Sequence, residues 1–141
     1  MKLGEIKLEA LKLMFVNDGE ILNMENLDEY LYGNEVYRGY LVNMVGSINR
    51  SLNRFKMKNI KPLDDKEYVK FTDDTPNDTE IDFIPEELQE IIPYFIKGEL
   101  YQEDEPNMAS SSMNYFESLL DDYLDNRPPT QEKVKILYGW E

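Results

Sequence analysis

The chain has 141 residues, enough for one domain with a sizeable core, and 41% of them are hydrophobic, as in folded proteins. Its 29 acidic and 15 basic residues give a formal charge of −14, which argues against binding to nucleic acid or to an anionic membrane, because both need surplus Lys and Arg. The absence of Cys and His excludes disulfides, thiolate metal sites and the side chain best suited to proton transfer near neutral pH.

Residues 2–16 are predicted to form an amphipathic helix. Lysines and glutamates alternate through it, and its apolar face consists of Leu3, Ile6, Ala10, Leu13 and Met14. Asn17-Asp18-Gly19 is predicted to end this helix, because glycine suits a left-handed cap. Asn26 and Glu29 then have the spacing of a capping box for the next turn.

The longest helix is predicted from Glu35 to Met57, after a break at Gly33-Asn34. Its apolar stripe has helical spacing and consists of Tyr37, Leu41, Met44, Val45, Ile48, Leu52 and Phe55. Gly39 and Gly46 each weaken the helix by about 1 kcal/mol relative to Ala, so tertiary packing has to hold it. A glycine on the buried face would also let a neighbouring helix come close.

Residues 61–83 depart from the helical pattern. The segments 67–71 and 80–83 favour short strands on either side of the turn-rich residues 72–79. A β-hairpin that leads directly into a helix at Pro85 is the simplest prediction. An ordered loop is the alternative.

Residues 84–124 carry most of the predicted core, as two helices joined at Glu103-Asp104-Glu105-Pro106. Pro85 suits the first helical position, and Pro93 predicts a kink or a restart because it removes a backbone hydrogen bond. The short connection predicts antiparallel packing. The apolar positions are Leu88, Ile91, Ile92, Phe95, Ile96 and Leu100 in the first helix and Ala109, Met113, Phe116, Leu120 and Leu124 in the second.

The last residues, 130–141, are predicted to form an extended arm, separated by Pro128-Pro129 from a helical domain of residues 1–129. An exposed apolar edge needs a cover, which is either the body of the same chain or a neighbouring subunit. We favour the neighbour. The alternating apolar residues of the arm are Val134, Ile136, Tyr138 and Trp140, of which Tyr138 and Trp140 are interface candidates. The predicted fold is therefore mainly α: a bundle of about four helices with a small β-hairpin and this C-terminal arm.

Two oppositely charged segments are candidates for a functional surface. Eight acids and no base lie between residues 98 and 126, whereas five bases follow one another without an acid around the end of the longest helix. A head-to-tail contact between copies would pair these segments, and such heterologous contacts close into rings. Simpler interpretations are favourable charge at a helix C-terminus and a solvated acidic face. The candidates are Arg50, Arg54, Lys56, Lys58 and Lys61 on the basic side and Glu103, Asp104, Glu105, Asp121 and Asp122 on the acidic side.

No catalytic signature, metal site or cofactor site is predicted. The carboxylates could in principle hold Mg²⁺ or Ca²⁺, but their spacing matches no calcium-loop or two-metal pattern. No window approaches the roughly 18 apolar residues of a membrane span, and the charged N-terminal residues are unlike a signal peptide, so a cytoplasmic protein is the expectation.

Four short motifs follow one another in the last two helices: Ile92-Pro93-Tyr94-Phe95, Glu99-Leu100-Tyr101, Glu103-Asp104-Glu105-Pro106 and Asn114-Tyr115-Phe116. Together they resemble the helical hairpin of head–tail connector (adaptor) proteins of tailed bacteriophages and prophages. The resemblance implies a structural, non-enzymatic subunit of an oligomeric ring between the portal and the tail. It also implies portal and tail proteins as partners, and a place in the host cytoplasm during assembly and then in the virion.

Two alternatives compete with this interpretation, ahead of an enzyme, which without His or Cys would depend wholly on carboxylates and a metal ion. The first is an acidic intracellular interaction protein or DNA mimic that sequesters a basic partner, which the charge of −14 would suit. The second is that the aromatic residues of the motifs are only the core of an unrelated helical domain.

Overall fold

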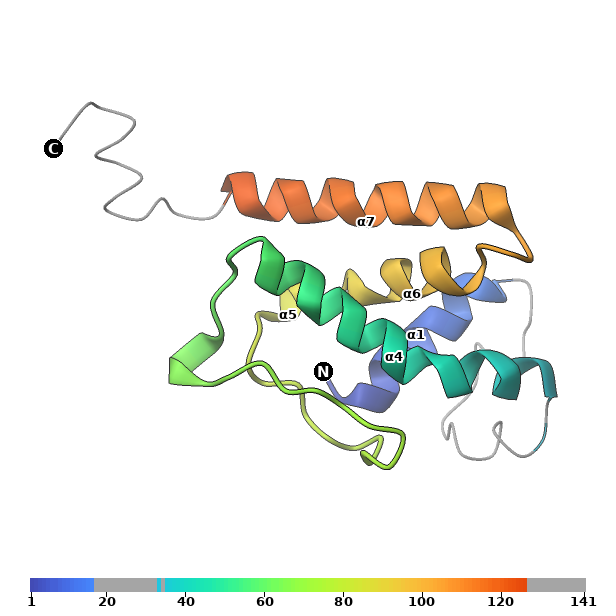
Figure 1. The fold of residues 1–141 in the computed structure, drawn as a ribbon, viewed down its shortest axis with the longest axis horizontal. Helices are drawn as coiled ribbons and strands as arrows, with labels where there is room; N and C mark the ends of the chain where they lie inside the picture. Colours follow the sequence, from blue (N-terminus) through green and yellow to red (C-terminus); the bar gives the residue numbers. More distant parts are fainter. Residues whose placement is uncertain (17–32, 34, 127–141) are drawn as a thin grey trace, which may run out of the picture.

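The computed structural model of the chain describes residues 1–16, 33 and 35–126. This part is mainly helical, as predicted (Figure 1). The predicted stop at 17–19, the cap at 26–29 and the arm at 130–141 lie outside the described residues. The elements are α1 (Leu3–Met14), α4 (Glu35–Met57), the short 3-10 helix η1 (Leu63–Asp65), α5 (Glu86–Gln89), α6 (Ile92–Leu100) and α7 (Pro106–Asn126).

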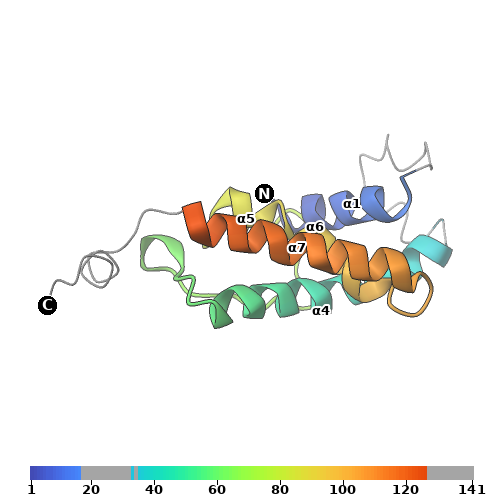
Figure 2. The same ribbon diagram turned by 90° about the horizontal axis from the view of Figure 1, so that it is seen from above.

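The short helix α6 lies at the centre of the fold. It packs against α1, α4 and α7, and Figures 1 and 2 show α7 running antiparallel to it across one side. Ile92 and Ile96 of α6 are fully buried. The predicted helical hairpin is therefore present, and it supplies the surface on which the other two long helices pack. None of the helices in the described part of the chain combines the length and the apolar character needed to cross a bilayer.

Helices α1 and α4 bury the apolar faces that were predicted for them, with one exception in α1. The helix from Glu35 to Met57 has the predicted bounds, and all seven residues of its predicted stripe are buried. In α1, Leu11 is fully buried while Leu13 is only partly buried. The core face of α1 is therefore rotated slightly from the predicted one.

The prediction that the helix is interrupted and begins again near Pro93 is confirmed. α5 ends at Gln89, and α6 begins at Ile92 with Pro93 in its first turn, where a missing backbone N–H costs no helical hydrogen bond. Gln89 is buried, with 3% of its surface exposed, and ties the junction together. Its Nε2 donates to the carbonyl oxygens of Ile81 (2.7 Å) and Ile84 (2.9 Å), and its Oε1 accepts from the N-terminal amino group (2.8 Å).

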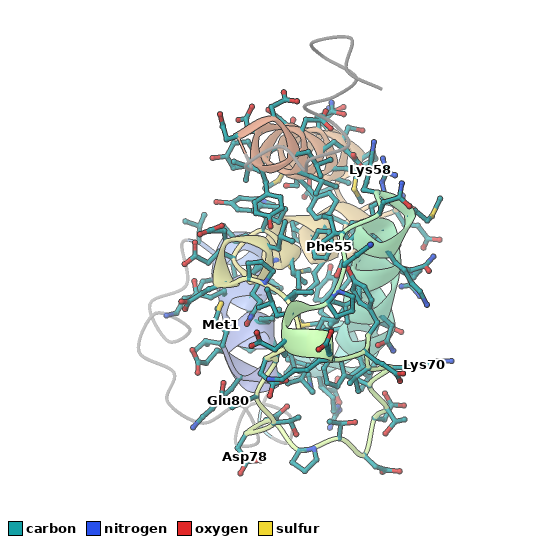
Figure 3. All side chains as sticks on the ribbon, turned by 90° about the vertical axis from the view of Figure 1, so that its left-hand side faces the viewer. Met1, Phe55, Lys58, Lys70, Asp78 and Glu80 are labelled. Carbon is teal, nitrogen blue, oxygen red and sulfur yellow. The ribbon has the colours of Figure 1, made fainter. Side chains whose placement is uncertain are left out.

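The predicted β-hairpin is wrong. Within the described residues, the segments 67–71 and 80–83 form no strands but follow an ordered loop, which was the alternative (Figure 3). One isolated antiparallel bridge occurs near them, and it joins Glu80 to Lys2 rather than to the 67–71 segment.

The backbone groups that a hairpin would pair are bonded to other parts of the chain. The amide of Phe71 donates to Oδ1 of Asn49 on α4, and Nδ2 of Asn49 donates back to the carbonyl oxygen of Phe71, both at 2.9 Å. The amide of Ile81 donates to the carbonyl oxygen of Met1, also at 2.9 Å. The first segment is thus held by α4 and the second by the N-terminus, so the two do not meet as strands.

The core depends on a cluster of three phenylalanines from three helices. The ring of Phe116 (α7) lies 5.0 Å from that of Phe95 (α6) and 5.9 Å from that of Phe55 (α4), measured between centroids. Phe116 and Phe55 are fully buried. Aromatic pairs at these separations add to the stabilisation that burial alone provides.

Replacing Phe116 with Ala should lower the free energy of unfolding by about 3–5 kcal/mol, because it leaves a cavity shared by all three helices. Met108→Ala, at a side chain that is 40% exposed on the same helix, is the matched control and should change it little. Urea denaturation followed by circular dichroism measures both. Similar stability of the two variants would show that the phase of α7 is wrong.

A second constraint is the close approach of α6 and α7 at Gly98. A Cβ at this position would lie 3.1 Å from Cβ and 3.2 Å from the backbone nitrogen of Met113 on α7. The glycine that permits helix contact is therefore in α6, whereas at Gly39 of α4 nothing lies within 4 Å of the added carbon.

The variants Gly98→Ala and Gly39→Ala should shift stability in opposite directions. Alanine at Gly39 should stabilise by roughly 0.5–1 kcal/mol through helix propensity. Alanine at Gly98 makes the same propensity gain but has to push α7 away, so the net effect should be destabilising. Thermal melts of both variants beside the wild type provide the comparison. Stabilisation by Gly98→Ala would contradict the close packing.

Candidate functional site

Two of the predicted basic interface residues are paired within the chain. Arg54 binds Glu117 of α7 through two parallel contacts, Nε to Oε1 and Nη2 to Oε2, both at 2.9 Å. Arg50 donates from Nε to both carboxylate oxygens of Glu99 on α6, also at 2.9 Å. These ion pairs lie at the surface, so each contributes at most about 1 kcal/mol. The two arginines therefore join α4 to α6 and α7.

The remaining bases surround two adjoining grooves at the C-terminal end of α4. The grooves have volumes of about 400 and 490 Å³, and both are lined by Lys56 and Tyr68. Lys61 and Lys66 line one groove and Lys70 the other, while Lys58 is half-buried nearby. Lys66 also forms an ion pair with Asp82 at 3.0 Å.

Sequence reasoning missed Lys66 and Lys70 as members of this basic surface. Both follow the run of five bases by a few residues, but Asp64, Asp65 and Glu67 interrupt the pattern. The loop brings the two lysines back toward α4, because Phe71 is held by Asn49. This contact, together with the hydrogen bond from the hydroxyl of Tyr68 to the carbonyl oxygen of Ile60 (2.7 Å), holds the loop beside the C-terminal end of α4.

The acidic candidates form two separate groups. Glu103, Asp104 and Glu105 lie in the turn between α6 and α7, whereas Asp121 and Asp122 lie in the C-terminal half of α7 (Figure 1). The turn is held in place by Tyr40 of α4, whose hydroxyl donates to Oδ2 of Asp104 at 2.6 Å. Burial, and then this hydrogen bond, raises the pKa of Tyr40.

The C-terminal end of α4 and the α6–α7 turn, which carry basic and acidic candidates respectively, lie toward opposite ends of the molecule (Figure 1). Figure 1 shows the C-terminal end of α4 toward one end and the α6–α7 turn at the other. Lys56 and Lys61 are exposed at the first, and Glu103 and Glu105 are exposed at the second. Within one chain these groups therefore lie apart, and a second chain could bring them together. Tyr138 and Trp140 lie outside the described residues.

A third surface was not predicted from the sequence. A groove of about 640 Å³ lies between α5, α6 and the C-terminal half of α7. Its apolar and aromatic lining is Ile91, Tyr94, Leu119 and Tyr123, and its exposed carboxylates are Glu87, Glu90 and Asp122. We call it the acidic groove. The sequence gives only a weak indication of this groove, because its acids come from two segments far apart in the chain and lie among residues of the core pattern.

The described residues contain no group of three or more His, Cys, Asp or Glu side chains placed to hold a metal ion. Comparison of the chain with protein-family models, with characterised proteins and with solved structures found no match. The resemblance to connector proteins stays a prediction.

The contact between Tyr40 and Asp104 can be tested through its pH dependence. The folded pKa of Tyr40 is raised above the unfolded value near 10, so the unfolded chain loses this proton first. The stability contributed by the neutral hydroxyl is present in full below about pH 10 and is lost as the pH rises further. The stability difference between wild type and Tyr40→Phe should therefore shrink above pH 10, as measured by urea unfolding from pH 8 to 12. A constant difference would contradict the contact.

Proposed function

We propose that the chain is a structural, non-catalytic subunit that assembles head to tail into a ring, in the manner of the head–tail connector proteins of tailed phages. The observation that carries the proposal is that exposed Lys56 and Lys61 belong to the region at the C-terminal end of α4, whereas exposed Glu103 and Glu105 belong to the α6–α7 turn at the other end of the molecule (Figure 1). A contact between unlike ends is heterologous, and repetition of such a contact closes a ring when the rotation allows it.

The motifs behind the resemblance support the hairpin part of this proposal. Tyr94 and Tyr115 meet edge to face at 4.7 Å, and Phe95 and Phe116 do so at 5.0 Å. Each pair joins a motif of α6 to a motif of α7. The same packing would stabilise an unrelated helical hairpin, so the distribution of charge has to distinguish a ring subunit from any other helical protein.

The ring proposal explains the acidic segment better than DNA mimicry does. A mimic needs an unbroken row of carboxylates with the spacing of phosphates. Glu99 and Glu117 are instead neutralised by Arg50 and Arg54 of the same chain. These pairs divide the acids into the turn at one end and the group on α7 at the other.

The contact should be weak for an isolated protein. Exposed ion pairs contribute roughly 0.2–1 kcal/mol each and are screened over about 10 Å at 0.1 M salt. Assembly would then be favoured by high concentration or by a template such as the portal. The proposed role is to pack and to match charge, and no reaction is expected.

A charge-swap experiment tests the head-to-tail contact. Lys56→Glu with Lys61→Glu, and separately Glu103→Lys with Glu105→Lys, should each abolish the formation of rings, because like charges would then meet at the end-to-end contact. Mixing the two variants should restore association. The reversed, acidic end of the first variant then meets the reversed, basic turn of the second, and the unaltered basic end of the second meets the unaltered acidic turn of the first. Light scattering and negative-stain imaging at low salt measure the assemblies, with mixed pairs as the expected product.

The control is Asp73→Lys, an exposed loop position that belongs to neither end of the proposed contact. It should associate like the wild type. Rings that survive both charge reversals, or ring formation that does not weaken as the salt concentration rises, would rule out the head-to-tail contact.

A further inference from the structure

We propose that the acidic groove binds residues 130–141 of a second copy of the chain. The inference rests on the proposed function only in requiring self-association, and it concerns a different surface from the charged ends. The groove combines apolar side chains from two layers of the fold with carboxylates from both. Leu119 and Tyr123 come from α7 and Ile91 from the α5–α6 junction, so the groove follows the seam between them.

The chemistry of the groove selects a basic segment with apolar residues. Glu87, Glu90 and Asp122 are exposed around it, and no Lys or Arg is among the residues that line it. Half-buried Tyr94 and Tyr123 offer aromatic surface to an incoming side chain. A segment that places apolar residues on this lining and lysines near the carboxylates would satisfy both features, since lysine stems lie along apolar surface while their charged heads reach outward.

Residues 133–140 of this segment have this composition. Apolar residues alternate at Val134, Ile136, Tyr138 and Trp140, and Lys133 and Lys135 lie on either side of Val134. The two acids of the segment, Glu132 and Glu141, lie outside residues 133–140. In an extended segment the two kinds of residue project to opposite sides, so the apolar side can face the groove while the long lysine side chains bend toward the carboxylates at its edge. In a chain with a formal charge of −14, residues 133–140 contain two lysines and no acid, so this stretch complements an acidic groove.

The position of the groove favours a second copy as the donor of this segment. Asn126 lines the groove and is the last residue of α7, so the chain leaves the helix at the end of the groove. Only Arg127, Pro128 and Pro129 separate that point from residue 130. Two consecutive prolines favour a stiff, extended spacer, which disfavours an immediate reversal back along the same groove.

Trp140 is the only tryptophan of the chain, so its fluorescence reports on this segment alone. Docking on a second copy predicts an emission shift to shorter wavelength that grows with protein concentration. Glu90→Lys with Asp122→Lys should raise the concentration needed for half of the shift by on the order of tenfold, because attraction at two exposed positions becomes repulsion. Asp78→Lys is the matched control, since Figure 3 shows this residue on the side of the molecule opposite α7, and it should leave the curve unchanged.

The failure of this inference is distinguishable from failure of the ring. The variant Glu103→Lys with Glu105→Lys should lose the rings seen by negative-stain imaging but keep the concentration-dependent shift of Trp140. A shift that does not depend on concentration would show that each chain fills its own groove. No shift, or a shift equally strong in the Glu90→Lys, Asp122→Lys variant, would show that the groove does not bind the segment. Each of these three outcomes overturns the inference.

Crosslinking then identifies the donor directly, because the natural chain has no cysteine. A chain with Glu90→Cys and a differently tagged chain with Lys135→Cys should form a mixed disulfide-linked dimer when they are oxidised together. Asp78→Cys in place of Glu90→Cys should give much less of it. Equal yields from the two partners would overturn the assignment of the groove, and a chain carrying both Glu90→Cys and Lys135→Cys that links only to itself would overturn the second copy as donor.

Discussion

The packing of Phe116 between two other helices is the interaction on which the rest of the structure depends. Its ring contacts Phe95 on α6 and Phe55 on α4, so one side chain of α7 fixes the relative position of three helices. Gly98 allows this contact by letting α7 come close to α6. The ion pairs of Arg50 and Arg54 then lie at the edges of the same junction. Because all of them converge on the helical hairpin, every proposed interaction surface is built on elements that this junction positions.

The long loop between α4 and α5 is ordered by polar contacts rather than by strand pairing. The side chain of Gln89 forms hydrogen bonds with two loop carbonyl oxygens and with the N-terminal amino group. The side-chain amide of Asn49 forms hydrogen bonds with both the backbone N–H and the carbonyl oxygen of Phe71. Buried Phe71 and Phe83 also contact each other at 6.2 Å. This arrangement matters for function because the loop carries Lys66 and Lys70 to the basic grooves beside α4.

The three charged surfaces suggest a division of roles in assembly. Exposed pairs between the basic end and the acidic turn would be weak and screened by salt, which suits orientation of one subunit against the next. The acidic groove offers aromatic and apolar area in addition to charge, so an arm seated in it would gain hydrophobic stabilisation that salt does not screen. Together, a weak end contact and a docked arm would give each subunit two attachments to its neighbour, which strengthens an assembly without requiring either contact to be tight.

The sequence by itself determined the elements whose signal is local. Helical spacing identified α4 with its full stripe and most core positions of α6 and α7, although Leu100, Met113 and Leu124 are only partly buried. Pro93 marked the restart between α5 and α6. These features depend on residues close together in the chain. The tertiary structure alone decided which partners the polar groups take. The segments 67–71 and 80–83 resembled strands, but Asn49 and the N-terminus bind their backbones. Arg50 and Arg54 resembled an intermolecular patch, but Glu99 and Glu117 lie within reach in the same chain. Backbone hydrogen bonds and ion pairs are satisfied by whichever group the fold brings near, and that proximity is a property of the packed chain rather than of its local pattern.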